Sequence, residues 1–201
     1  DAASNSAVIR KHLDKNDKVF HGDIFGSPFF ILKDAEAVPD TTMNEIAHAT
    51  VCFSRAWREG LYGVSAYWVH PEQIKKSAPS GEFLPKGSFT IEGQRNFIKS
   101  ETLKLAVGII QLEDNDHVLT CGPPEAIKKN SICYAIIEPN GSEMAECAKK
   151  IRLEFLKIFE DITRKINIDE FVRALPAGKS QIKEISLGDL EKENIIDNEL
   201  E

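Results

Sequence analysis

Two short stretches of this 201-residue sequence hold side chains that could carry out chemistry. His21 and Asp23 stand two residues apart, and an imidazole near a carboxylate is typical of an acid–base pair or of two metal ligands. The glycines around them favour a hydrogen bond that organises a loop instead. Gly178-Lys179-Ser180 has the ending of a phosphate-binding loop, but Arg173 stands where that motif requires glycine. We therefore expect no catalytic residue and no enzyme activity.

Metal and cofactor sites are not indicated either. The four cysteines (Cys52, Cys121, Cys133 and Cys147) form no Cys-x-x-Cys pair, and the five histidines do not complete a zinc pattern with them. Three of the four stand in apolar stretches, where a free thiol behaves as a small hydrophobic side chain. We expect reduced thiols, a cytoplasmic protein, and neither metal nor cofactor.

The net charge of −7 is unevenly distributed along the chain. Residues 179–201 hold seven acidic side chains against three lysines, a net charge of −4. Residues 55–99 hold four acidic side chains against seven cations, a net charge of +3. Those seven cations are Arg55, Arg58, Lys75, Lys76, Lys86, Arg95 and Lys99. An acidic chain with one positive segment is compatible with a polyanionic partner, although a solvated surface would look the same.

The stretch YWVHPEQIKKSAPSGEF (67–83) lies inside this positive segment. An apolar strand pattern ends at Pro71, two adjacent lysines follow, and Pro79 restricts the chain beyond them. Ser80 and Gly81 belong to a small-residue turn that, like His21 and Asp23, we expect to organise a loop. The pattern indicates either a plain connection or a loop that displays cations to a ligand.

The chain has no apolar run of the roughly 20 residues that a membrane helix needs. It begins at Asp1 without a methionine, so we expect a fragment of a longer protein that is not embedded in a membrane.

Hydrophobic periodicity predicts an α+β fold, with a mostly antiparallel sheet packed against one mid-chain helix and one long carboxy-terminal helix. Thr42 and Glu45 suit a capping box for a helix over 43–59, which Gly60 ends as a left-handed cap. Strands are expected within 21–33 and over 61–69, 87–93, 102–112, 117–121 and 131–139. Trp57 and Trp68 both follow apolar periodicity, so we expect core positions for them.

Pro139-Asn-Gly141 is expected to form a turn, after which Ser142 caps a long helix with an apolar stripe that extends to Ile166. Asn167 and Glu170 form a second capping box, which opens a short helix that Pro176 and Gly178 end. Beyond it the sequence is acidic and lacks a sustained period. We expect one domain over 1–178 and a flexible acidic tail over 179–201.

The order of several longer blocks resembles a known family. The blocks are DAASN (1–5), KHL (11–13), HGDIFGSPFFILK (21–33), CFSRAW (52–57) and AYWVHPEQIKKSAPSGEFLPKGSFTIEGQRNF (66–97). Together they resemble the RNA-binding domain of the NFACT proteins, which are ribosome quality-control factors once labelled fibronectin-binding. The resemblance is strongest over residues 1–112. The later blocks ICYAIIEPNGSEMAECAKKI (132–151) and IDEFVRALPAGKS (168–180) are similar to archaeal members.

This resemblance implies an RNA-binding module, not an enzyme. Proteins of the family act on stalled nascent chains on the large ribosomal subunit, so the implied partners are large-subunit RNA, tRNA and the remaining domains of a parent NFACT protein. Together with the positive segment, it points to Lys75, Lys76, Lys86 and Arg95 as RNA-binding residues, with Arg55 and Arg58 as a second rank. Contacts of this kind would hold phosphates without reading the base sequence.

A second function remains open on the sequence alone. A protein-interaction module without direct RNA contact would use aromatic loop residues as anchors in a partner's groove. The candidates are Phe25, Phe29, Phe83 and Phe89. Such binding would depend little on salt, whereas phosphate binding would depend on it strongly.

Overall fold

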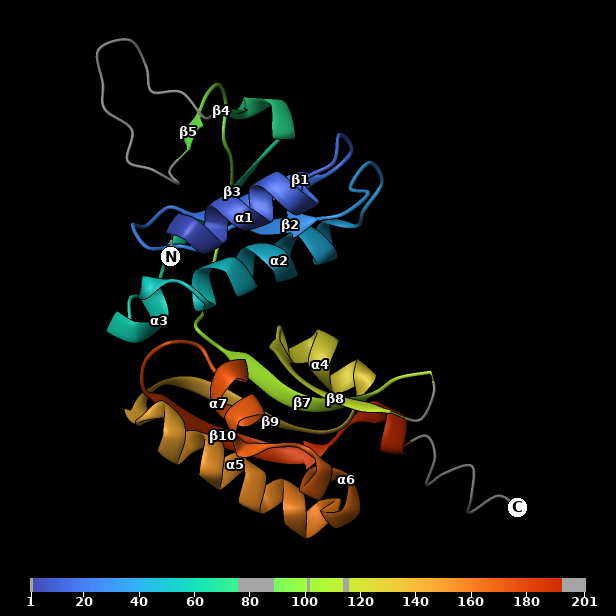
Figure 1. Ribbon diagram of the computed structural model, residues 1–201. Coiled ribbons are helices and arrows are strands. Elements are labelled where there is room, and N and C mark those ends of the chain that lie inside the picture. The colour runs from blue at the N-terminus through green and yellow to red at the C-terminus, as the bar shows by residue number, and fades with distance from the viewer. Residues whose placement is uncertain (1, 76–88, 101, 114–115, 193–201) are drawn as a thin grey trace. The chain divides into compact units, whose positions relative to one another are not determined.

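The computed structural model describes residues 2–75, 89–100, 102–113 and 116–192, without the side chains of residues 2–5 (Figure 1). The chain divides into two compact units where one domain over 1–178 was expected. Unit 1 comprises residues 1–56 and 61–102, and unit 2 comprises residues 57–60 and 103–201. Each unit has its own antiparallel four-stranded sheet and its own helices, so the predicted α+β class with antiparallel pairing is confirmed.

Unit 1 is built around a sheet with strand order β2-β1-β3-β6. Its strands are β1 (Lys18–Gly22), β2 (Phe30–Leu32), β3 (Ser65–Val69) and β6 (Asn96–Lys99). A two-stranded ribbon joins β4 (Ile74–Lys75) to β5 (Thr90–Ile91), and a single 3₁₀ turn (Pro71–Gln73) precedes it. The helices are α1 (Ala2–His12), α2 (Asp40–Cys52) and α3 (Arg55–Glu59), and α3 passes from unit 1 into unit 2.

The two faces of this sheet pack against different helices. On one face Val19 and Val69 are directly paired, and they form a core cluster with Ile9 of α1. On the other face Phe20 and Ala66 are fully buried. Phe30 of β2 is paired with Phe20, and its ring contacts Phe53 at the end of α2. Because side chains alternate along a strand, one short strand such as β1 supplies both cores.

The predicted helix over 43–59 is in fact two helices. The first of them, α2, begins at Asp40 after Pro39, so the capping box expected at Thr42 is not used. At the break, the Ser54 hydroxyl donates to the Val51 carbonyl at 2.6 Å and accepts from the Ala56 amide at 3.1 Å. Serine competes in this way for backbone groups, which ends α2 and starts α3. Gly60 has φ +63°, the left-handed end that was predicted.

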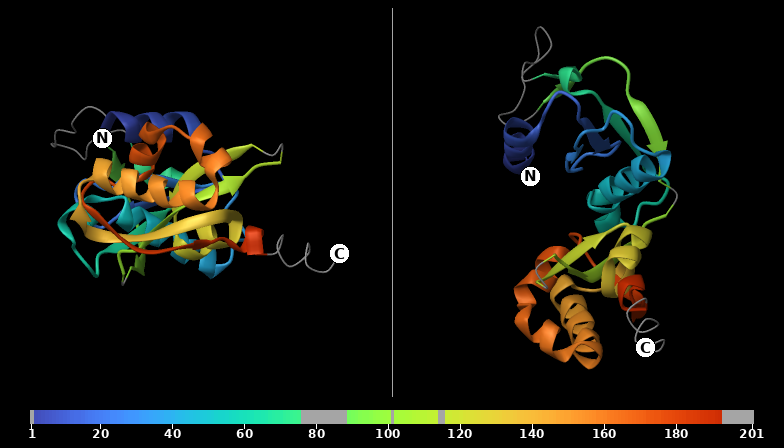
Figure 2. Two further views of the ribbon diagram at one scale, coloured as in Figure 1. Left: turned by 90° about the horizontal axis from the view of Figure 1, so that it is seen from below. Right: turned by 90° about the vertical axis from the view of Figure 1, so that its right-hand side faces the viewer.

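Unit 2 contains a sheet with strand order β10-β9-β7-β8. Its strands are β7 (Leu105–Gln111), β8 (His117–Gly122), β9 (Ser131–Ser142) and β10 (Ser180–Leu187). Its helices are α4 (Pro124–Asn130), α5 (Met144–Ile158), α6 (Glu160–Lys165) and α7 (Ile168–Ala174). Ile127 of α4 packs on Ala106 and Tyr134 on one face, whereas α5 contacts β9 and β10. Figure 2 shows the ribbon of this unit from two further sides.

Two boundaries in unit 2 differ from the sequence-based expectation. Strand β9 continues through Pro139 and Gly141 to Ser142, where a turn was expected, and β10 pairs with it from Cys133 to Pro139. The long helix breaks at Phe159, whose φ of −133° and ψ of 73° are not helical, so its apolar stripe is divided between α5 and α6. The capping box at Asn167 and Glu170 is confirmed.

The prediction of a flexible tail over 179–201 is wrong for residues 180–187. These residues form β10, which pairs with β9 from Ser180 opposite Pro139 to Leu187 opposite Cys133. Ser180 is 1% exposed, and its hydroxyl accepts a hydrogen bond from the Trp57 indole at 3.2 Å. Residues 193–201 of the predicted tail lie outside the described residues.

None of the helices in the described ranges combines the length and apolar character that a membrane crossing needs.

Candidate nucleic-acid interface

A row of aromatic rings crosses the sheet of unit 1 from one edge to the other. His21 of β1 is paired with Tyr67 of β3, and Tyr67 is paired with Phe97 of β6. The ring centroids lie 5.8 Å apart for His21 and Tyr67, and 5.5 Å apart for Tyr67 and Phe97. Phe29, just before β2, extends the row with a centroid distance of 4.8 Å to His21. Directly opposed positions in antiparallel strands bring such rings together on one face.

Exposure rises sharply at the β6 end of this row. Tyr67 is 4% exposed, whereas Phe97 on the edge strand is 56% exposed. The Arg95 guanidinium carbon lies 4.8 Å from the centre of the Tyr67 ring, which is cation–π geometry. Arg95 and Phe97 are two residues apart, so a held cation and an exposed ring stand side by side at the sheet edge.

The buried part of the row carries no charge at neutral pH. Burial lowers the pKa of His21 below 6.5, and the nearby Arg95 charge adds to that effect. Burial raises the pKa of Tyr67, whose hydroxyl lies 3.4 Å from Nδ1 of His21. His21 is therefore a neutral imidazole and Tyr67 a neutral phenol. Within the row, the positive charge therefore lies beside the rings, on Arg95 over Tyr67.

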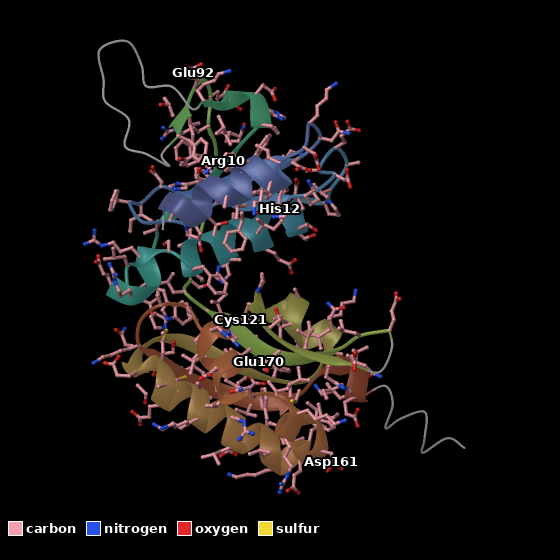
Figure 3. All side chains as sticks on the ribbon, in the orientation of Figure 1. Arg10, His12, Glu92, Cys121, Asp161 and Glu170 are labelled. Carbon is pink, nitrogen blue, oxygen red and sulfur yellow. The ribbon has the colours of Figure 1, made fainter. Side chains whose placement is uncertain are left out.

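The side chain of Gln73 holds the turn of residues 92–94, which leads into Arg95. Its side-chain amide donates to the carbonyls of Glu92 and Gln94, both at 2.8 Å, and its carbonyl oxygen accepts from the His70 amide at 2.9 Å. The turn between them passes through Gly93 at φ +80°. Figure 3 labels Glu92 beside the β4–β5 ribbon. Sequence reasoning missed Gln73 because its partners are distant in the chain.

Only some of the predicted RNA-binding cations fall within the described residues. Lys75 lies on β4 opposite Thr90 and is half-buried. Arg55 is exposed at the start of α3 in unit 1. Arg58 belongs to unit 2, and its guanidinium lies 3.9 Å from the carboxylate of Glu59. Lys76 and Lys86 lie outside the described residues, as do Ser80, Gly81 and Phe83.

The predicted loop-organising pair is divided between β1, which contains His21, and the loop after it, which begins at Asp23. His21 lies within β1, and its ring meets backbone groups of Gly22 and Ser27. The amide of Asp23 donates to the Ser65 carbonyl at 2.8 Å. Ser27 is only 5% exposed, and its hydroxyl accepts a hydrogen bond from the Gly22 amide at 2.8 Å. Ser27 thus ties the loop to the end of β1, a role that the sequence did not indicate.

The aromatic residues proposed as protein anchors have different surroundings. Phe25 is 87% exposed in the loop after β1. Phe29 and Phe89 contact each other edge-to-face, with centroids 6.0 Å apart, and pack on the core cluster of unit 1. Among the three anchors that the structure describes, Phe25 therefore presents the most apolar surface.

Cysteine and metal chemistry find little support in the described part of the chain. Burial raises the pKa of the Cys133 thiol to about 12 and that of the Cys147 thiol to about 11. A nucleophilic cysteine requires a lowered pKa. Across residues 2–75, 89–100, 102–113 and 116–192, no group of three His, Cys, Asp or Glu side chains is placed to hold a metal ion.

Comparison with known proteins identifies the amino-terminal region. Residues 1–93 match the family model for the NFACT protein RNA binding domain. The archaeal Rqc2 homolog aRqcH of Methanocaldococcus jannaschii is 38% identical over 183 residues, which cover 90% of this chain and 26% of that protein. The human ribosome quality control complex subunit NEMF is 31% identical over 112 residues, 55% of this chain and 10% of NEMF.

This chain therefore spans about a quarter of its archaeal relative and a tenth of the human one. Among solved structures, the carboxy-terminal part of the fibronectin/fibrinogen-binding protein of Streptococcus suis is 22% identical with a TM-score of 0.41, covering 50% of this chain and 38% of that one. From the family match and the archaeal relative, we conclude that residues 1–93 belong to the family of NFACT protein RNA-binding domains.

Proposed function

We propose that this chain is an RNA-binding module, for tRNA or ribosomal RNA, of a ribosome-associated quality-control factor that acts on stalled nascent-chain complexes of the large subunit. The observation that carries the proposal is the match of residues 1–93 to the NFACT protein RNA binding domain. The archaeal relative named an Rqc2 homolog adds support. Such a module works in the cytoplasm, beside the other domains of its parent protein.

The surface of unit 1 suits this role because one of its cations, Arg95, is held in place before RNA arrives. The guanidinium of Arg95 lies over the Tyr67 ring, and Gln73 holds the turn that precedes it. A side chain fixed in this way loses less conformational entropy on binding a phosphate than a free one does. Lys75 lies on the ribbon that begins beside Gln73 and supplies a second cation. Contacts of this kind position RNA without reading its sequence.

The module's part in the process is binding, and peptide-bond chemistry belongs to the ribosome. The buried, high-pKa thiols of Cys133 and Cys147 and the neutral His21 in its aromatic row support this assignment. The module uses no metal and no cofactor.

The experiment is a salt titration of binding to tRNA and to purified large ribosomal subunits. Each phosphate-neutralising cation contributes about 0.7 to 0.9 to the slope of log affinity against log salt. Changing Lys75→Gln and Arg95→Gln together should lower the slope by about 1.5 and weaken binding at low salt. Lys157→Gln is the matched control, since Lys157 is an exposed lysine of unit 2 paired with Glu154.

An unchanged slope in the folded double variant would exclude Lys75 and Arg95 as the RNA contacts. Binding to subunits without salt dependence would favour the second function, a protein-interaction module. The exposed ring of Phe25 supports that alternative, so Phe25→Ala should then abolish association.

A further inference from the structure

The aromatic row of unit 1 ends in a ring that is supported on one side and open on the other. Phe97 packs against Tyr67 at an interplanar angle of 62°, yet 56% of Phe97 remains exposed. Single exposed apolar side chains are common on protein surfaces and need no explanation by themselves. The neighbours of Phe97 are what make this ring informative.

Cations flank Phe97 on its own strand face. Lys99 follows Phe97 by two residues within β6, a spacing that puts both side chains on one face of the strand. Arg95 stands just before β6 and reaches the same face through the Tyr67 ring. Arg95 is held on the Tyr67 ring at 4.8 Å, and Lys99 is paired with Ser65 across the sheet. An aromatic ring between two cations complements a base that has a phosphate on either side. A neutral apolar peptide would gain nothing from those charges.

We infer that Phe97 is a stacking platform for one unpaired RNA base, with Arg95 and Lys99 beside the adjoining phosphates. This inference rests on the proposed function and names its ligand class as single-stranded RNA. The base must be unpaired because an A-form duplex stacks both faces of every base inside the helix. Stacking on an aromatic ring is tolerant of sequence, since all bases have a π-face.

The sheet prepares the ring for this role. A phenylalanine has only two side-chain torsions, and packing against Tyr67 limits them further, so a base meets a surface that is already ordered. Among the strands that the structure describes, β6 is the last of this sheet, and none of them stands beyond Phe97 in the strand order.

The test compares the 201-residue chain on a short unstructured RNA and on the same RNA annealed to its complement. Fluorescence anisotropy at several salt concentrations gives the affinity and the salt slope. Phe97→Leu should weaken binding to the single strand about 10-fold and leave the salt slope unchanged, because a stacked ring neutralises no phosphate. Phe97→Trp should bind at least as tightly as the wild type.

Two matched variants separate the contributions. Arg95→Gln should lower the single-strand salt slope by about 0.7, which a change at Phe97 should not do. Phe25→Leu removes a ring that is 87% exposed and outside the aromatic row, so it should leave RNA binding unchanged. Circular dichroism checks that each variant is folded.

The outcomes distinguish this inference from the function on which it rests. If the wild type binds neither RNA with a salt dependence, the proposed function fails. If the wild type binds but folded Phe97→Leu binds the single strand equally well, the platform is wrong and RNA binding stands. An equal loss on single strand and duplex also overturns stacking. Should Phe97→Leu not fold, 2-aminopurine in the single strand decides, since a stacked base must change its fluorescence on the wild type.

Discussion

Asp17, in the connection between α1 and β1, should be the most stabilising carboxylate of unit 1. Its side chain is fully buried and accepts hydrogen bonds from the Asp14 amide at 2.7 Å, the Asp34 amide at 3.2 Å and Nζ of Lys33 at 2.7 Å. Lys33 also pairs with the Asp14 carboxylate at 2.5 Å, but that side chain is 78% exposed. The two carboxylates share one cation and differ in burial.

The expected cost of Asp17→Ala is about 3 kcal/mol. Hydrogen bonds to charged groups contribute about 1.5–3 kcal/mol each, and solvent entering the site recovers part of the loss. Asp14→Ala should cost no more than about 0.5 kcal/mol, since exposed ion pairs contribute little. For a unit of about 100 residues, 3 kcal/mol lowers the thermal midpoint by about 12–24 °C.

The dependence on pH follows from the direction of the Asp17 pKa. Burial alone would raise it, but the hydrogen bonds from Lys33, Asp14 and Asp34 outweigh burial and lower it below 3.8. A carboxylate with a lowered folded pKa stabilises the protein above its unfolded pKa, and this stabilisation is lost as pH falls through the folded value. The difference between wild type and Asp17→Ala should therefore be full at neutral pH and shrink below about pH 4.

The assay is urea unfolding of the full chain followed by tryptophan fluorescence. Trp68 lies in unit 1 and Trp57 in unit 2, so repeating the measurement with Trp57→Phe assigns the unit 1 transition. If Asp17→Ala and Asp14→Ala lose the same stability, then burial and the two backbone hydrogen bonds do not give Asp17 its role. If the difference in stability between wild type and Asp17→Ala were as large at pH 2 as at pH 7, the lowered pKa of Asp17 would be contradicted.

Three further perturbations test other parts of the chain. A chain that ends after Gly178 lacks β10 and should lose at least about 10 °C in midpoint, whereas a chain that ends after Lys192 keeps β10 and is its control in calorimetry. Gln73→Ala frees two backbone carbonyls and should weaken RNA binding about threefold with an unchanged salt slope; equal affinity would show that the turn holds itself. Gly108→Val should destabilise unit 2 by about 2 kcal/mol in urea unfolding, because a Cβ there would lie 2.5 Å from a methyl group of Ile127; no loss would mean that α4 yields freely.

Local helix signals in the sequence were reliable where nothing competed with them. At Asn167 and Glu170 the capping box forms as predicted, with both hydrogen bonds at 2.9 Å. The same motif at Thr42 and Glu45 does not start a helix, because Pro39 upstream already supplies an extended residue and a fixed φ from which α2 begins. Short sequence motifs identify possible helix starts, and the surrounding chain selects among them.

Strand β10 escaped prediction for a different reason. Ile182 and Ile185 stand three residues apart in the sequence, which interrupts the period-2 alternation of a regular strand. In the structure, a shift in register between Ile182 and Glu184 accommodates this spacing. Averaged over 179–201, the acidic composition then resembles a disordered tail. Pairing with β9 supplies the stability that composition does not indicate. Helices α1 and α4 and strand β6 were likewise not predicted.

The candidate site could be predicted only in part. Net charge pointed to the segment that contains Arg95, but nothing in the sequence around it indicates Tyr67 as its partner. The row from His21 through Tyr67 to Phe97 depends on pairings between three strands that are distant in the chain. Such a row is a property of sheet register, which periodicity within one strand cannot determine.

The hydrogen bond from Trp57 to Ser180 has a consequence for the order of synthesis. The two residues are 123 positions apart, and Trp57 is 1% exposed in the finished protein. At a synthesis rate of about 5–20 residues per second, Ser180 is made about 6–25 s after Trp57. Throughout that delay the indole lacks its partner, while unit 1 is complete once residue 102 has emerged. The newly made chain therefore presents an uncovered tryptophan to chaperones, and closure of the second sheet removes it.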